Sequence, residues 1–357
     1  MTSPRELIQN GLPLVAVGTA CCVLLALVTG NRPVDLILTV VGGAWGSAES
    51  AMATLSKTPP LLLTGLAVSL AYRVGLLNIG GEGQLTLGAL TTALVARSDW
   101  GLPGGFGLLP SLVCGAAAGA LWAAPAMWLR QHRGVHEVIS TLLLNYLALH
   151  LADYLVRGPL GDGSAMGRSV EIAPAAVIQP WFGSAVGGLG PAPLMALLLA
   201  LGAWFWLERS VWGFEARAVG ANRQAAAAAG IAVSGWQWRL FLMSGALAGL
   251  AGGIEVAAVH HRFYAAFSPG YGYDGITVAF LAGADPAWLW AGALLLAGLR
   301  ATDKWLQLAL GISPNAIFVI EAVLLLTVAC RTALAAGLER GFGRIAARLR
   351  SAGGGSS

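Results

Sequence analysis

The stretch R-V-G-L-L-N-I-G-G-E-G-Q-L-T-L-G-A-L, Arg73 to Leu90, decides the fold. It lies between the apolar runs Pro60–Tyr72 and Leu85–Val95. Its middle combines glycines with three strongly polar side chains, Asn78, Glu82 and Gln84. Lipid cannot satisfy an opened backbone, so such a break survives only where protein or a water-filled cavity lines it. Because interrupted helices commonly line substrate paths in transporters, the stretch predicts a transport pathway close to these side chains.

The composition places the chain in a membrane. It has 357 residues, of which 57% are hydrophobic and 11% charged, and its mean hydropathy is +0.72. Soluble domains carry about 25% charged residues. The predicted class is therefore an all-α polytopic membrane protein. The net charge of +4 informs topology rather than nucleic-acid binding, and the four cysteines lie in apolar runs without metal-ligand spacing.

Apolar runs near the required length of about 20 residues predict about ten transmembrane helices, some of them short or broken. The predicted spans are Leu12–Thr29, Pro60–Arg73, Glu82–Ala96, Phe106–Leu129, Glu137–Val156, Pro191–Trp206, Trp238–Val259, Gly275–Leu281, Leu289–Leu299 and Ile312–Cys330. Arginine placement favours both termini inside the cell. We interpret the first run as an uncleaved helix rather than a signal peptide.

The chain is predicted to form one transmembrane permease domain over residues 1–350. Its longest outer loop is 157–190, for which a solvated connector and a contact with an external partner are both open. Residues 31–57 form another outer segment, in which a short interfacial helix could lie at Val34–Val41. Residues 351–357 form a flexible Gly/Ser tail.

A second interrupted region suggests an internal repeat. Tyr271–Leu299 contains Gly272, Asp274 and Gly275, a short apolar piece, and the break G-A-D-P at Gly283–Pro286. Two interrupted segments in corresponding halves are typical of a transporter core. Asp274 is accordingly a candidate residue of the pathway.

The segment 208–235 is the longest inner connection before the tail. Asn222 is a good N-cap and Gly230 a good C-terminal glycine for a helix of about two turns between them. A helix this short is marginal by itself in water. It either docks into a groove of another protein or lies as an elbow on its own bundle.

Other polar residues in apolar runs have competing interpretations. Asn145 either lines the pathway or bonds a neighbouring helix. Glu82 either faces the pathway or favours the positive end of its own helix. Glu255 and Glu321 are functional candidates by default, and a proton-coupled role stays open for them. The stripe Gly245, Gly249 and Gly253 predicts close helix packing inside the subunit, with a dimer contact as the alternative.

Several motifs are absent from the sequence. It contains no phosphate-binding G-x-x-x-x-G-K-[ST] loop, no G-x-S-x-G, no H-E-x-x-H and no C-x-x-C pair. His132 and His136 stand four residues apart without a further ligand nearby. We therefore expect no enzymatic activity, no metal and no cofactor in this chain.

Three motifs carry a resemblance to a known family. R-V-G-L-L-N-I-G-G-E-G-Q (Arg73–Gln84), G-V-H-E-V-I-S-T-L-L-L-N-Y (Gly134–Tyr146) and A-V-G-A-N-R-Q-A-A-A-A-A-G-I (Ala218–Ile231) resemble permease subunits of bacterial ABC importers. The resemblance is to the ribose and simple-sugar permease-like branch that includes nucleoside importers. It covers about Pro60 to Cys330. His136, where the family suggests asparagine, is a departure.

The resemblance implies several partners. A cytoplasmic ABC ATPase, which carries ATP and Mg, would bind the coupling helix Asn222–Ile231. The residues implied at that contact are Gly220, Asn222, Arg223, Ala226, Ala229 and Gly230. A second permease subunit would complete a homodimer or heterodimer, and an extracytoplasmic substrate-binding lipoprotein would deliver the solute. The expected location is the bacterial inner membrane.

The sequence thus predicts a permease subunit of an ATP-driven importer that moves a nucleoside or a related purine or pyrimidine by alternating access. The candidate path residues are Asn78, Glu82, Gln84, Asn145 and Asp274. A simple-sugar permease and a proton-coupled secondary transporter using Glu82, Glu255 or Glu321 are the alternatives.

Overall fold

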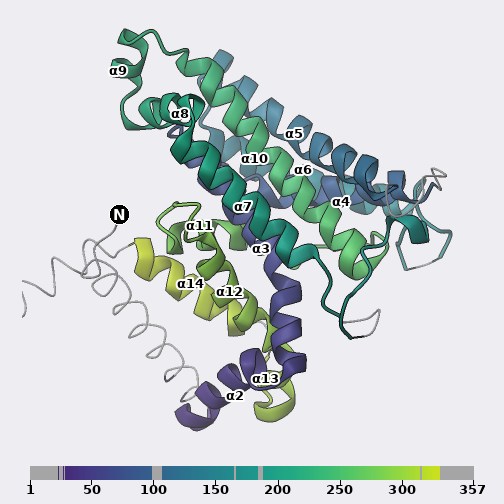
Figure 1. Ribbon diagram of the computed structural model, residues 1–357. Helices are drawn as coiled ribbons and strands as arrows, with labels where there is room; N and C mark the ends of the chain where they lie inside the picture. Colours follow the sequence, from purple (N-terminus) through teal and green to yellow (C-terminus); the bar gives the residue numbers. More distant parts are fainter. Residues whose placement is uncertain are drawn as a thin grey trace, which may run out of the picture. The chain divides into compact units, whose positions relative to one another are not determined.

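The computed structural model describes residues 29–98, 107–164, 166–183, 188–313 and 316–329, together with Val23 and Leu27. These residues form helices and loops (Figure 1). Within the described ranges there is no strand beyond two isolated bridges, Arg168 with Tyr264 and Phe182 with Leu189. The helices are α2 Pro33–Trp45, α3 Ala48–Tyr72, α4 Gly81–Ala96, α5 Leu108–Arg133, α6 Glu137–Arg157, η2 Pro174–Ala176, α7 Ala192–Arg209, α8 Val211–Ala221, α9 Arg223–Ala228, α10 Val233–Glu255, the π turn η3 Val256–His260, α11 Tyr271–Leu281, α12 Leu289–Ala301, α13 Asp303–Leu310 and α14 Ala316–Ala329. The predicted all-α class is confirmed.

The chain divides into two compact units. One comprises Met1–Thr39 with Leu306–Ser357, and the other comprises Val40–Trp305. In the first unit, the Asn31 side chain donates to the Leu310 carbonyl at 3.4 Å, and Leu36 and Glu321 are buried. A single permease domain over residues 1–350 stays a prediction.

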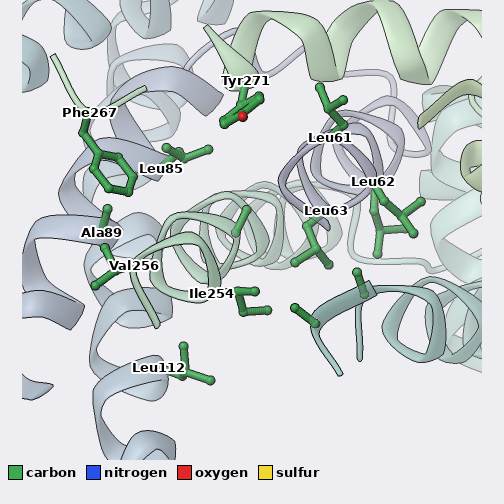
Figure 2. Packing of buried hydrophobic residues seen from close by; sticks show 14 of the residues in the cluster. Leu61, Leu62, Leu63, Leu85, Ala89, Leu112, Ile254, Val256, Phe267 and Tyr271 are labelled. Atoms are coloured by element: carbon green, nitrogen blue, oxygen red, sulfur yellow. The ribbon is translucent and has the colours of Figure 1, made fainter. Parts of the chain in front are cut away.

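Helix α4 is the centre of the second unit. It packs against α5, α6, α10 and α11, and most of its residues are buried. Figure 2 shows Leu85 and Ala89 of this helix in the apolar core with Val256 and Phe267. Helix α3 packs against α7, α10, α11 and α12. Because α4 is buried on most sides, its sequence is apolar nearly all round and has no amphipathic stripe. The few polar residues of α4 therefore stand out in the sequence.

Glycines allow the helices around α4 to approach closely. A Cβ on Gly249 of α10 would lie 2.4 Å from the Gly115 carbonyl oxygen of α5. A Cβ on Gly88 of α4 would lie 2.3 Å from the Gly249 Cα. The predicted stripe on α10 therefore makes packing contacts inside the subunit, as expected for small residues at membrane helix contacts.

Four described helices have the length and apolar composition needed to cross a membrane. They are α5, α6, α7 and α10 with its extension to His260. A fifth span results if α2 and α3, which are bent by 75°, are counted as one. The predicted spans at Glu82–Ala96, Glu137–Val156 and Leu289–Leu299 correspond to α4, α6 and α12, but α4 and α12 are short. About ten spans and an inside location for both termini stay predictions.

The sequence prediction for residues 31–57 was wrong in part. Helix α3 begins at Ala48, so Pro59 and Pro60 lie inside it rather than at its start. Membrane helices tolerate proline because neighbouring helices and hydroxyl side chains satisfy the freed carbonyls. Pro59 and Pro60 remove the donors for the carbonyls four residues earlier, those of Leu55 and Ser56. The interfacial helix expected at Val34–Val41 is the longer α2.

Parts of the segment 157–190, whose outer location stays a prediction, pack on the bundle. Backbone bonds join Ile172 to His261 and Ile178 to Ala257, and both isoleucine side chains are buried. Asp162 follows the turn at residues 158–160. Hydrogen bonds from Ser164, assisted by Arg168, lower the pKa of Asp162 to about 2.

Two predicted features fall outside the described residues. They are most of the first apolar run Leu12–Thr29 and the tail 351–357.

Candidate functional site

The break after α3 is closed by a glycine. The amide of Gly75 donates to the Tyr72 carbonyl and the amide of Leu76 to the Ala71 carbonyl, at 2.9 and 3.1 Å. This pair of bonds is a Schellman motif, and it needs a left-handed residue, which Gly75 provides with φ of 69°. The chain then runs on to α4 at Gly81 without helical bonds for residues 76–79, so their backbone groups need other partners.

Two side chains at the break bond each other. The Asn78 amide nitrogen donates to Gln84 Oε1 and to Ser244 Oγ of α10, each at 2.9 Å. Its oxygen accepts the backbone N–H of Gly80 at 2.9 Å and the Gln84 amide at 3.1 Å. Asn78 and Gln84 are 2% and 1% exposed. These polar atoms satisfy one another, and they fix the entry of the chain into α4.

Asn145 on α6 bonds the opened backbone directly. It accepts the backbone N–H of Gly83 at 2.9 Å and donates to the Ile79 carbonyl at 2.8 Å. Its amide also lies 3.4 Å from the Tyr273 hydroxyl of α11. Glu137, at the start of α6, accepts the backbone N–H of Leu77 and forms an ion pair with Arg130. We call Asn78, Gln84, Asn145, Glu137 and Ser244 the break network.

Glu82 joins the beginnings of two helices. It lies in the first turn of α4, and its Oε2 accepts the backbone N–H of Gly272, in the first turn of α11, at 2.8 Å. Its exposed fraction is 2%. A carboxylate is stabilised by the unpaired N–H groups at a helix beginning. The carboxylate therefore serves the beginning of α11 as well as that of its own helix.

The two interrupted regions of the sequence meet at this point. A Cβ on Gly272 would lie 2.1 Å from the Glu82 nitrogen, and one on Gly81 would lie 3.2 Å from the Gly272 carbonyl oxygen. Residues separated by about 190 positions thus touch backbone to backbone. No periodicity in the sequence indicates this contact.

Asp274 forms a buried ion pair with Arg300. Its two carboxylate oxygens lie 2.9 and 2.7 Å from Nη2 of Arg300 on α12. Both residues are buried, with exposed fractions of 6% and 4%. Arg300 was missed in the sequence, although a lone arginine inside the apolar run Leu289–Ala301 was an available signal.

Glu255 has a partner that the sequence did not indicate. Its Oε1 lies 3.4 Å from Nε2 of His260, one turn further along the chain in η3. Glu255 is 4% exposed.

The segment 208–235 contains the short helix α9, Arg223–Ala228. Asn222 caps it by accepting the backbone N–H groups of Gln224 and Ala225 at 2.9 and 3.0 Å, and Gly230 follows it with φ of 80°. The predicted caps are confirmed. Ala226 is buried, whereas Ala229 and the remaining residues from 221 to 230 are exposed.

Helices α8 and α9 contact the break itself. The Arg223 guanidinium donates to the Gly75 carbonyl at 2.7 Å. A Cβ on Gly220 would lie 2.1 Å from the Arg73 carbonyl oxygen. Arg73 in turn lies 3.5 Å from Glu208 and 3.6 Å from Asp285. Helices α8 and α9, which follow α7 in Figure 1, are therefore in direct contact with the chain between α3 and α4.

Interrupted helices with polar residues enclosed in an apolar bundle are common in membrane transport proteins. The chain belongs to the family of branched-chain amino acid transport system / permease components, whose pattern matches residues 50–329.

Relatives in this family have names that agree with the predicted resemblance. The chain is 34% identical to a guanosine ABC transporter permease protein of Bacillus subtilis (strain 168), over 90% of this chain and 94% of that protein. It is 37% identical to a glucose ABC transporter permease protein of Haloferax volcanii, over 76% and 74% of the two chains. It is 28% identical to a nucleoside ABC transporter permease protein of Lactococcus lactis, over 90% of each.

Proposed function

We propose that this chain is a permease subunit of an ATP-driven importer for nucleosides. The observation that carries the proposal is the direct contact of the capped helix α9 with the break before α4, through Arg223 and Gly75. A subunit without an ATPase motif needs a place where external motion enters, and this contact leads from an exposed inner helix to the polar centre. The nucleoside names of relatives that match 90% of the chain support the solute class.

The break network gives the motion a route. A displacement of α9 pulls on Gly75, and the chain from Gly75 to Gly81 is held by Asn78 and Asn145. Glu82 passes the displacement on to α11, because its carboxylate holds the Gly272 amide. Partner ATPases that close on ATP would in this way alternate the access of the path between the two sides.

The wider assembly is part of the proposal. It contains a pair of cytoplasmic ABC ATPases, a second permease subunit and an extracytoplasmic binding lipoprotein, in a bacterial inner membrane. Ten spans with both termini inside would place α8 and α9 on the ATPase side. The arginines at 209, 217 and 223 near these helices fit the bias of basic residues toward the cytoplasm.

The solute class is tested by ATPase stimulation. The complete complex, reconstituted in proteoliposomes with its binding protein, is expected to hydrolyse ATP faster with nucleosides than with free bases or pentoses. Equal or greater stimulation by sugars would assign the chain to sugar transport. Solute uptake driven by a proton gradient without the ATPase would instead favour a secondary transporter.

The coupling contact is tested by Arg223→Ala. The substitution removes the bond to the Gly75 carbonyl, so we expect the ATPase to stay bound while ATP hydrolysis no longer responds fully to solute. The measurement is the ratio of stimulated to basal ATPase activity, which should fall at least twofold.

Gln224→Ala is the matched control for Arg223→Ala. It alters the next exposed side chain of the same helix, and its amide group has no bond in the described structure. Deletion of residues 222–230 should abolish ATPase assembly altogether. Assembly that survives the deletion contradicts the docking role of α9.

A further inference from the structure

The exposed side of α6 differs from the exposed sides of α5 and α7. Apart from the last turn of each helix, the exposed residues of α5 and α7 are all apolar. Examples are Leu121, Leu198 and Phe205. Helix α6 exposes Tyr146 and His150 close to its midpoint at residue 147, together with Tyr154 farther along. Tyr146 is 58% exposed. An imidazole in the middle of a span is costly in lipid and normally faces the bundle interior or a water-filled cavity.

Helix α11 presents a partly exposed side next to this face. Tyr273, Ile276 and Phe280, spaced three and four residues apart, are its partly exposed large side chains before the final residue. The Tyr273 hydroxyl receives the amide of Asn145, the residue before Tyr146 on α6, at 3.4 Å. The two helices therefore expose these residues on the same side of the break.

Aromatic rings continue along α11 toward its end. Phe280 follows Tyr273 by seven residues, about 10 Å at 1.5 Å per residue. Its ring meets that of Tyr72, the last residue of α3, edge to face at 5.9 Å between centroids. Tyr72 is 50% exposed. We call Tyr146, Tyr273, Phe280 and Tyr72 the aromatic strip.

We propose that the aromatic strip is the wall of the solute path and that it takes the planar base of a nucleoside by stacking. The inference rests on the proposed nucleoside function and adds the residues that recognise the solute. Aromatic side chains stack on any base because each base has a π face, so the strip suits passage without tight selection. The three tyrosine hydroxyls, assisted by Asn145 at Tyr273, supply hydrogen bonds to the polar edges.

According to this proposal, the buried polar residues of the break hold the helices in place, and the aromatic strip contacts the solute. Asn78, Glu82, Gln84 and Asn145 are at most 2% exposed and bond one another or the backbone. They hold the helix beginnings behind the strip. In the strip itself, Tyr146 and Tyr72 are 58% and 50% exposed, and Tyr273 and Phe280 are partly exposed.

The first test measures water access with cysteines. In a background with Cys21, Cys22, Cys114 and Cys330 replaced by serine, Tyr146→Cys and Ile276→Cys are placed on the proposed wall, and Leu121→Cys and Phe205→Cys on α5 and α7. The assembled complex is treated with a membrane-impermeant, positively charged methanethiosulfonate. We expect labelling at the first two positions, slowed by guanosine, and none at the last two.

Two outcomes of the labelling would overturn the proposal. If Tyr146→Cys and Ile276→Cys stay unlabelled like the controls, the α6 face lies in lipid. If Tyr146→Cys instead forms a disulfide between two copies of the chain and resists the reagent, the face is a subunit contact.

The second test measures uptake of radiolabelled guanosine below half-saturation. Tyr273→Leu and Phe280→Leu should each reduce the uptake rate roughly tenfold. A loss of this size corresponds to the removal of one stacking interaction between a base and an aromatic ring. Tyr273→Phe should keep most of the rate because the ring remains. Phe205→Leu, the same kind of change on the apolar side of α7, should have no effect.

The uptake results also separate the two proposals. If both leucine variants take up guanosine at the normal rate, the stacking role of the aromatic strip is wrong, while the proposed nucleoside function is unaffected. A wild-type complex that takes up sugar but no nucleoside refutes the function, and the stacking role fails with it.

Discussion

Gly272→Ala is expected to be the most damaging single-methyl change in the described chain. The new Cβ would lie 2.1 Å from the Glu82 nitrogen and 2.3 Å from its Cα, and no flexible side chain is there to move away. Overpacking a core costs about 1–3 kcal/mol and occasionally more, and contact with two backbone atoms belongs at the upper end. We expect a loss of about 3 kcal/mol in the free energy of unfolding, measured by thermal unfolding of the detergent-purified subunit.

Gly202→Ala is the matched control for this prediction. Gly202 lies in the middle of α7, has no positive φ, and a Cβ there would meet nothing within 4 Å. Replacing a glycine by alanine in a helix interior stabilises the helix by roughly 0.5–1 kcal/mol. Equal melting temperatures for Gly272→Ala and Gly202→Ala would mean that α4 and α11 do not touch through their backbones.

Arg300→Met is expected to have the second large effect. The substitution leaves the Asp274 carboxylate buried without the guanidinium that lies 2.7 and 2.9 Å from its oxygens. Removing one member of a buried ion pair costs about 3–5 kcal/mol. The amount of folded subunit that survives extraction, and its unfolding temperature, should both fall.

A double substitution distinguishes the ion pair from a general need for arginine. Asp274→Leu combined with Arg300→Met removes both charges, and well-packed apolar replacements for a buried pair are often neutral or stabilising. The double variant should therefore recover most of the lost stability. Arg157→Ala, which breaks the exposed pair with Asp153 at 2.8 Å, is the control and should cost less than about 1 kcal/mol. If the double variant unfolds as readily as Arg300→Met, the arginine acts through other contacts.

The Arg300–Asp274 pair and the Gly272–Glu82 contact differ in how far the sequence indicates them. Arg300 and Asp274 are single charges in apolar runs, and the cost of burying a charge implies that each needs a partner. Their pairing across 26 residues follows from the packing of α11 and α12, which the sequence does not specify. Gly272 carries even less signal, because a glycine before an apolar run is equally consistent with a simple loop.

The proposed path residues show the same division. The sequence singled out Asn78, Glu82, Gln84 and Asn145 because polar groups in apolar surroundings are costly. The structure gives each of them a bonding partner, which satisfies that cost without a solute. The aromatic strip was not predicted, because tyrosine and phenylalanine are ordinary in a membrane helix until their exposure is known.

The sequence by itself determined the membrane class, the break at Arg73–Leu90 and the capped helix after Asn222. Each of these follows from local chemistry: too few charges to cover a soluble surface, a backbone opened by glycine, and a side chain that caps the residues beside it. Only the tertiary structure decided that α4 and α11 begin against each other, that Arg223 holds the break, and that Asp274 pairs with Arg300. Those contacts depend on which helices lie together. The spacing of glycines, as at Gly245 and Gly249, can mark a helix face that packs closely, but it does not say which helix lies against that face.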